Sequence, residues 1–283
     1  MKDLAYTPYT ELMCLDSAIK YIGGKPSVRF NNDKQEKLYE FWLYNNRELG
    51  ILSEELRGYS GSAEYINSIL KDSGFTVRLP EDTIAPIGGC KFATAGILDY
   101  GMKWVAPKSD IVECEGVLYD AVKLHGFIYI CKLLGGEVVT IFETRTINND
   151  VVYLTKDNIP LDYNLNNIKI ANTFMGYTII PTAHISHIGD VEWLEGLYID
   201  DKAPIWIEKA VQESIIDINL EGIIAKSTTA VLCLSGCCGI DYQEENLYIV
   251  DAPYNIFITR PGLSKSIISA HIPINNWNII GGE

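Results

Sequence analysis

The stretch that decides the expected fold is Leu12-Met-Cys-Leu-Asp-Ser-Ala-Ile-Lys-Tyr-Ile-Gly-Gly24, close to the N-terminus. Its apolar side chains recur at intervals of three and four residues, and this spacing places them on one helical face. Gly23 and Gly24 end the helix, because glycine readily adopts the left-handed conformation found at helix C-termini. The stretch therefore predicts an amphipathic helix over residues 12–22, with Cys14 near its start.

The rest of the N-terminal third is also predicted to be helical, and the chain beyond residue 80 to be mostly strand. Helices are predicted over residues 35–44 and from the capping sequence Ser60-Gly-Ser62 to Gly74. β-Branched runs separated by Gly, Pro and Asn predict strands at residues 127–131, 138–142, 151–154, 168–171, 177–180, 215–219, 230–234, 247–250 and 255–259. One late helix is expected over residues 204–213. This order predicts an α+β fold, with regions 1–158 and 159–283 packed into one unit.

Composition and charge narrow the classes of partner. The 283 residues include 37 acidic and 23 basic side chains, for a formal net charge of −14, and 47% of them are hydrophobic. The negative charge argues against nucleic acid or an anionic membrane as a partner, and it suits a cationic small molecule. The chain has no apolar run long enough for a membrane span and no signal-peptide pattern, so a cytoplasmic location is expected.

The seven cysteines favour free thiols over disulfides, since their number is odd and the expected compartment is reducing. They are Cys14, Cys90, Cys114, Cys131, Cys233, Cys237 and Cys238. No second Cys/His cluster accompanies the last three, so neither a metal nor another cofactor is expected. Cys14 is the candidate nucleophile, because the partial positive charge at a helix N-terminus lowers a thiol pKa and favours the thiolate.

Residues 14–23 resemble the nucleophile helix of bacterial papain-like proteins. The double-glycine peptidases of bacteriocin export and the butirosin biosynthesis protein H family have a cysteine near the start of the domain. A small residue, an aromatic and a glycine follow it, as Ala18, Tyr21 and Gly23 follow Cys14 here. The resemblance implies a papain-like fold, in which a histidine at the start of a strand activates the cysteine and a neighbouring carboxylate or amide orients the histidine.

Within that resemblance, His125 and Asp157 complete a catalytic triad with Cys14. His125 precedes the predicted strand 127–131, and Asp157 ends a later one, although Glu143 is an alternative orienting acid. We therefore expect Cys14 to attack a thioester or amide carbonyl. His125 would accept and return the proton, and Asp157 would hold the imidazole.

A rival location for the same strand–turn–strand pattern begins at residues 230–234 and ends at Asp251. Thr228-Thr229 stand where the histidine would precede it. In that alternative the base is missing or is supplied by His184 or His187.

The resemblance to the butirosin protein favours an acyltransferase of antibiotic biosynthesis. It implies that an acyl group passes from an acyl carrier protein thioester, or from a small acyl donor, through Cys14 to a cationic acceptor such as an aminoglycoside. The alternative in the same fold is a papain-like cysteine peptidase, in which water resolves the acyl-enzyme.

A second resemblance implies a protein without enzymatic activity. Asn219-Leu-Glu-Gly222, Thr229-Ala-Val231 and Asp251-Ala-Pro-Tyr254 are similar to the hinge and late strands of serpins. Serpins have longer chains, chiefly at the N-terminus, and their hinge favours small residues, unlike Ile223, Ile224 and Lys226 here. This resemblance implies a protease-binding or inhibitory protein with a loop near residues 223–240 that proteases cut.

Overall fold

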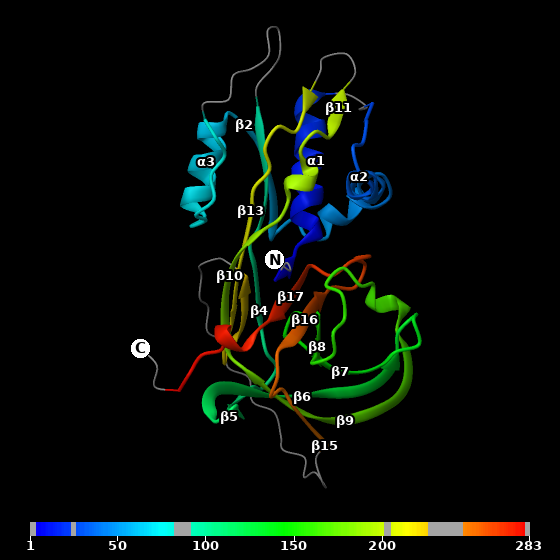
Figure 1. Cartoon of the computed structure of the whole chain (residues 1–283), viewed down its shortest axis with the longest axis vertical. Coiled ribbons are helices and arrows are strands. Elements are labelled where there is room, and N and C mark those ends of the chain that lie inside the picture. Colours follow the sequence, from blue (N-terminus) through cyan, green and yellow to red (C-terminus); the bar gives the residue numbers. More distant parts are fainter. Residues whose placement is uncertain (1–3, 24–26, 82–91, 201–204, 226–245, 281–283) are drawn as a thin grey trace. The chain divides into compact units, whose positions relative to one another are not determined.

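The computed structural model describes residues 4–23, 27–81, 92–200, 205–225 and 246–280 (Figure 1). The chain divides into two compact units, each assembled from separate stretches of sequence. Unit 1 comprises residues 1–100, 186–215 and 262–267, and unit 2 comprises residues 101–185, 216–261 and 268–283. Each unit draws on both sides of residue 158, so this division differs from the predicted regions 1–158 and 159–283.

Unit 1 holds the three α-helices of the described residues, α1 (Pro8–Ile22), α2 (Asp33–Asn45) and α3 (Ala63–Asp72). Their ends follow from the residues that cap them. The side chains of Asn32 and Ser62 accept hydrogen bonds from the backbone N–H groups of Gln35 and Tyr65. Gly23 ends α1 with a left-handed φ of 77°. The three helices predicted in the N-terminal third are confirmed.

The apolar face of α1 packs into the core of unit 1. Its neighbours include the antiparallel strands β2 (Leu56–Gly61) and β3 (Ala93–Leu98). Gly96 allows close packing there, because a Cβ on it would lie 2.2 Å from the carbonyl oxygen of Thr10. One core cluster consists of Leu15, Ala18, Ile19, Leu38, Val191, Leu194, Leu197 and Ile199.

The late helix predicted over residues 204–213 is wrong. Residues 205–206 form β12 (Ile205–Trp206), which pairs with β11 (Tyr198–Asp200), and β13 (Gln212–Ile218) begins before the predicted helix would end. Pairing with other strands outweighs the weak local preference for a helix.

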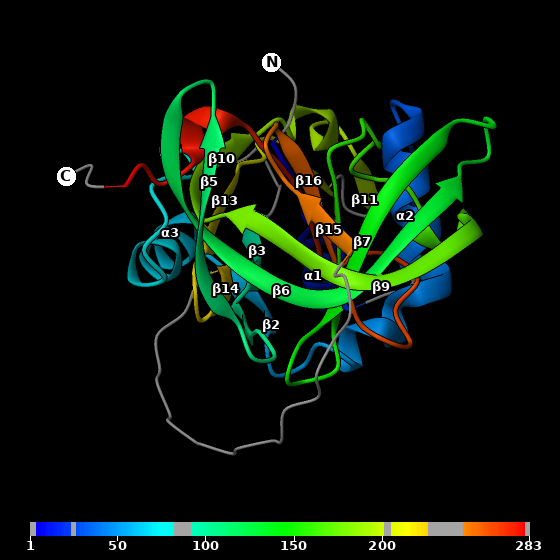
Figure 2. The same cartoon turned by 90° about the horizontal axis from the view of Figure 1, so that it is seen from below.

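Unit 2 is built on a large sheet whose strands run in the order β17-β16-β8-β7-β6-β9-β15, with β5 also pairing with β6. The strands are β5 (Lys108–Cys114), β6 (Val117–Lys132), β7 (Val138–Arg145), β8 (Val151–Thr155), β9 (Lys169–Pro181), β15 (Asn246–Ile249), β16 (Tyr254–Thr259) and β17 (Ile268–Ile272). Figure 2 shows the long strands β6 and β9 curving side by side. All these neighbours are antiparallel except β9 and β15, which are parallel.

A second sheet has the order β10-β13-β14-β4, with β10 (Ala183–Gly189), β14 (Gly222–Ala225) and β4 (Tyr100–Lys103). β14 belongs wholly to unit 2, and it lies between β13 and β4. The helices of the described residues include none that is long and apolar enough to cross a membrane.

The papain-like α+β fold, with a helical N-terminal third and a β-rich remainder, is wrong as an assignment of architecture. Its helices exist, but strand pairing decides the fold. Ala121 in β6 pairs with Pro181 in β9, for example, and β15 pairs with the same strand from a position still later in the chain. Such contacts join residues far apart in sequence, and local periodicity carries no information about them.

Candidate functional site

The turn that leads from β13 into β14 is locked by an asparagine. The side-chain oxygen of Asn219 accepts hydrogen bonds from the backbone N–H groups of Glu221 (2.9 Å) and Gly222 (3.1 Å). The backbone N–H of Asn219 also donates to the carbonyl of Gly222 at 3.0 Å. Asparagine often reverses a chain in this way. The turn sets the β13–β14 register, in which Asp217 faces Ile224.

Trp104, directly after β4, donates hydrogen bonds to two backbone carbonyls of the same turn. Its backbone N–H donates to the carbonyl of Glu221 at 3.1 Å, and its indole N–H donates to the carbonyl of Asn219 at 2.9 Å. The Trp104 side chain is almost fully buried. A buried indole N–H needs such a partner, so the tryptophan and the turn depend on each other.

Gly222 opens β14 where its backbone comes very close to β4. A Cβ at this position would lie 1.8 Å from the carbonyl oxygen of Met102, a distance that no side chain can occupy. Glycine inside a strand often marks such a close approach of two backbones. This position therefore admits no larger residue while β14 stays beside β4.

The remaining residues of β14 alternate between core and solvent. Ile223 is fully buried and Ala225 is buried, whereas Ile224 is 38% exposed. The buried face anchors the strand in the sheet. Residues 226–245, which lie outside the described part of the chain, follow Ala225 directly and end just before Asn246, the first residue of β15.

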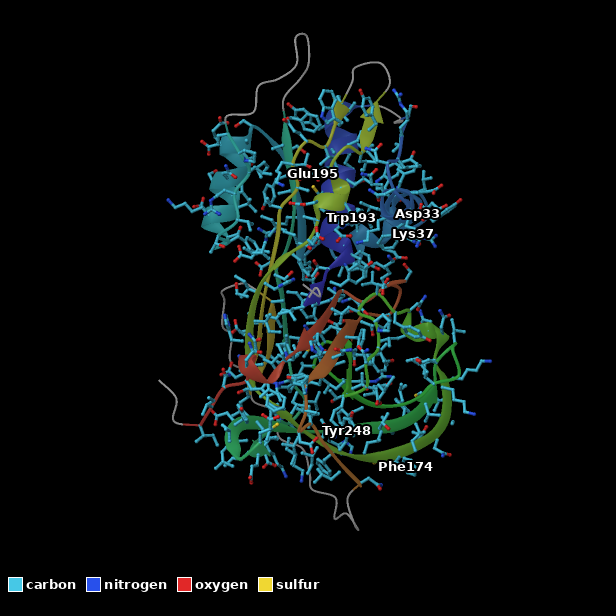
Figure 3. All side chains as sticks on the ribbon, viewed as in Figure 1. Asp33, Lys37, Phe174, Trp193, Glu195 and Tyr248 are labelled. Carbon is cyan, nitrogen blue, oxygen red and sulfur yellow. The ribbon has the colours of Figure 1, made fainter. Side chains whose placement is uncertain are left out.

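β15 is anchored by more than its backbone pairing with β9. Tyr248 of β15 is labelled in Figure 3. Its hydroxyl accepts a hydrogen bond from the backbone N–H of Lys156, directly after β8, at 3.0 Å, and the Thr178 hydroxyl of β9 donates to its carbonyl at 2.7 Å. Burial raises the pKa of Tyr248. The ammonium group of Lys156 also pairs with Asp251 at 2.8 Å, and this hydrogen bond lowers the pKa of Asp251. Both strands that flank residues 226–245 are thus firmly held.

Cys14 lies at the seventh position of α1, in its second turn. The helix dipole acts mainly over the first turn, so the expected activation of the thiol at a helix N-terminus does not apply. Its Sγ lies 3.1 Å from the hydroxyl oxygen of Thr94. Burial raises the pKa of the Cys14 thiol, and the hydrogen bond with Thr94 offsets part of that rise.

We expect Cys14 to react with iodoacetamide at pH 7 more slowly in the folded chain than in the urea-unfolded chain. Thiolate is the reacting form, and a raised pKa leaves less of the thiol ionised at pH 7. Labelling followed by peptide mass spectrometry measures the rate at each pH. Fast alkylation of folded Cys14 below pH 7 would contradict this expectation.

His125 and Asp157 belong to unit 2, whereas Cys14 belongs to unit 1. His125 is exposed on β6, and its ring meets the ring of Tyr177 edge to face at 5.1 Å. Asp157 accepts a hydrogen bond from the backbone N–H of Thr140 at 2.7 Å. Thr140 pairs with Ile130, which is roughly 16 Å along β6 from His125 at about 3.3 Å per residue. The catalytic roles assigned to these residues stay a prediction.

The alternative catalytic residues have other surroundings. His184 is exposed, and its Nδ1 lies 2.5 Å from a carboxylate oxygen of Asp217 in β13. His187 and Glu143 are both buried.

Several sequence predictions fall on residues outside the described part of the chain. They concern Cys90, Cys233, Cys237, Cys238, Thr228-Thr229 and the predicted strand 230–234. Within the described ranges, no group of three or more His, Cys, Asp or Glu side chains has the arrangement of a metal site.

Comparisons with known proteins assign the fold. No family model matches the sequence, and no curated protein matches it. Solved structures do match. Serpin48 of the insect Tenebrio molitor has a TM-score of 0.58 at 12% identity, covering 96% of this chain and 92% of that chain. The mouse protein Z-dependent protease inhibitor has a TM-score of 0.59 at 10% identity, covering 96% and 91%. Thyroxine-binding globulin in complex with thyroxine has a TM-score of 0.57 at 9% identity, covering 98% and 93%.

The chain therefore has a serpin fold, and the papain-like resemblance is wrong. The cysteine acyltransferase function rested on that resemblance and falls with it. Three further predictions depended on the same resemblance and are also wrong. They are the acyl carrier protein or small acyl donor, the cationic acceptor and the role in antibiotic biosynthesis. The second resemblance, to the hinge and late strands of serpins, has the better support.

Residues Asn219 to Gly222 carry the serpin resemblance in the sequence, but the sequence alone does not show that they form the turn that holds β14. Gly222 carried a usable signal, because an isolated glycine before a β-branched run often marks close backbone contact. No sequence signal pointed to the role of Trp104, since its hydrogen-bond partners lie more than a hundred residues later in the chain.

Proposed function

We propose that this chain is a protease-binding protein that presents residues 226–245 to a protease and has no enzymatic activity of its own. The observation that carries the proposal is the placement of β14 between β13 and β4, held by Trp104 and the Asn219 turn. Residues 226–245 join this strand to β15, which is anchored independently. A cytoplasmic location remains a prediction.

The fold by itself does not select this function, since one similar structure is a protease inhibitor and another binds thyroxine. The sequence of residues 226–245 favours a protease partner. Between Lys226 and Asp241 it contains no charged residue, and Val231, Leu232 and Leu234 lie near its middle. Chymotrypsin has an apolar primary specificity pocket and elastase a small one. Proteases of these classes fit the segment better than a trypsin-like protease does.

The sequence after β14 is also compatible with strand extension once the segment is cut. Ser227, Thr229 and Val231 continue the series of alternate positions that begins with the buried Ile223 and Ala225. All three are small or β-branched, as residues of an added strand often are. Insertion of a reactive loop into a sheet as an added strand is a known mode of β-augmentation.

We expect chymotrypsin and pancreatic elastase to cut the native chain first within residues 226–245. Several added strand hydrogen bonds, at about 0.5–1.5 kcal/mol each, would then raise the melting temperature of the cut chain by roughly 10 °C or more. Mass spectrometry locates the cut, and thermal unfolding of the purified cut chain measures the shift.

The control replaces Val231, Leu232 and Leu234 with glutamate, which should slow cleavage in the segment at least about tenfold by removing apolar side chains from the specificity pocket. The matched variant Leu134→Glu changes a leucine that is 71% exposed and lies between β6 and β7. It should be cut like the original chain. First cleavage elsewhere, or a lower melting temperature after the cut, would contradict the proposed function.

A further inference from the structure

β5 is the outer strand of a tight hairpin at a margin of the large sheet in unit 2 (Figure 2). It pairs antiparallel with β6 from Lys108 to Cys114, and among the residues that the structure describes it pairs with no other strand. Glu115 and Gly116 close the hairpin with positive φ angles of 52° and 80°. Positive φ at both central residues is typical of a type I′ turn, so the turn fixes the register between β5 and β6.

The backbone of Ile111, in the middle of β5, points away from β6. Its partner in β6 is Asp120. The N–H of Asp120 donates to the carbonyl of Asn278 at 2.9 Å, and its carbonyl accepts from the N–H of Thr182 at 2.8 Å, so both groups are used on the far side of β6. In an antiparallel ladder the residue opposite then turns both its groups outward as well. Ile111 therefore presents its N–H and C=O at the outer edge of β5, and the residues two places before and after it do the same.

An acidic side chain caps the middle of this edge. The carboxylate of Asp110 accepts a hydrogen bond from the backbone N–H of Ile111 at 2.8 Å. The donor that a neighbouring strand would use is thus satisfied within the chain. Charged side chains on edge strands commonly hinder pairing with other chains. The strength of pairing at this edge therefore depends on how readily Asp110 releases the Ile111 amide.

The outward residues Ser109, Ile111 and Glu113, which we call the β5 edge, complement a second copy of themselves. In an antiparallel pair centred on Ile111, the two Ile111 residues exchange N–H···O=C hydrogen bonds, and Ser109 of each copy lies opposite Glu113 of the other. The Ile111 side chain is 54% exposed, so the pair also brings two β-branched side chains into contact. Such a twofold contact is closed and joins two copies only.

The charges along β5 favour this antiparallel arrangement. Lys108, which pairs with Lys123 of β6, makes the start of the strand basic. Glu113 and Glu115 make its end acidic. In the centred pair, Lys108 of one copy lies opposite Cys114 of the other, between those two glutamates. The basic end of each copy thus meets the acidic end of the second copy, which a parallel arrangement would not provide.

We propose that the β5 edge binds the β5 edge of a second copy of this chain, and that Asp110 sets the strength of this pairing. Each copy gives up its Asp110–Ile111 hydrogen bond when the two edges meet. The inference goes beyond the proposed function and does not depend on it, because every residue that carries it belongs to the described part of unit 2.

The test replaces Asp110 with valine, which removes the cap and favours strand structure. Sedimentation velocity over a range of chain concentrations, at about 0.15 M salt, measures the dissociation constant of the dimer. The two capping hydrogen bonds of a dimer no longer have to be broken, so Asp110→Val should associate at least about tenfold more tightly than the unmodified chain. Asp110→Leu should act in the same way, and thermal unfolding verifies that each variant is folded.

The matched control is Asp120→Val, which removes the same charge from the strand beside Ile111 but removes no cap. Its dissociation constant should stay close to that of the unmodified chain. Adding Glu113→Pro to Asp110→Val should reverse the gain, because proline removes one outward N–H and leaves the hydrogen bonds between β5 and β6 in place. Hydrogen–deuterium exchange at the amides of Ile111 and Glu113 should slow as the Asp110→Val chain dimerises.

Three results would overturn the inference. In the first, the folded Asp110 variants associate no more tightly than the unmodified chain. In the second, Asp120→Val strengthens association equally, which would assign the effect to net charge. In the third, the Asp110→Val dimer forms without slower exchange at Ile111 or is unaffected by Glu113→Pro, which would place the contact elsewhere.

Discussion

Replacing Asp150 with alanine should lower the free energy of unfolding by about 3 kcal/mol, because it removes a buried carboxylate that pairs with the guanidinium of Arg260, whose side chain is only 19% exposed. Asp150 is 1% exposed, and Arg260 holds it with two parallel contacts, Nε–Oδ1 at 2.8 Å and Nη2–Oδ2 at 3.1 Å. The pair ties the turn between β7 and β8 to the end of β16. Urea unfolding followed by tryptophan fluorescence measures the loss.

The matched control is Asp251→Ala, which removes the carboxylate of an exposed ion pair with Lys156. Exposed pairs contribute at most about 1 kcal/mol, so this variant should unfold close to the original midpoint. Equal losses in the two variants would show that burial of the Asp150–Arg260 pair does not matter.

Replacing Gly222 with alanine should expel β14 from its place beside β4. The new Cβ would lie 1.8 Å from the Met102 carbonyl oxygen, and both groups belong to backbone that cannot move aside without breaking strand pairing. Overpacking of this kind costs about 1–3 kcal/mol or more. Local opening of β14 should therefore become roughly 10- to 100-fold more frequent. Hydrogen–deuterium exchange of the amides in residues 223–225 measures it.

Gly101→Ala is the control for Gly222→Ala, since Gly101 lies in β4 and a Cβ there meets no atom within 4 Å. Its exchange and stability should match the original chain within about 1 kcal/mol. Under the proposed function, the Gly222 variant should also be cut faster within residues 226–245. Unchanged exchange in β14 would mean that the sheet adjusts at this point and that Gly222 does not hold the strand in place.

The two strands that flank residues 226–245 are held in place by different kinds of contact. β14 is held by a turn and by one close backbone contact, whereas β15 is held by the partly buried Tyr248 and its hydrogen bonds. A change at Gly222 therefore acts on the entry to the segment and leaves its exit in place.

The amino-acid sequence by itself determined the local elements of this protein. The three N-terminal helices are where spacing and capping residues predicted them, and the turn at Asn219 is built from the residues quoted for the serpin resemblance. Local elements follow from contacts between residues a few positions apart, so a single sequence is enough to find them.

Only the tertiary structure decided the fold and the candidate site. The sequence suggested activation of Cys14 by the helix dipole, but α1 begins six residues earlier and burial raises the thiol pKa. The role of Trp104 depends on carbonyls of Asn219 and Glu221 that lie more than a hundred residues away. Pairing between distant strands is set by the shape and hydrogen bonds of the assembled sheets, and no local pattern in this chain indicates that β14 lies between β13 and β4.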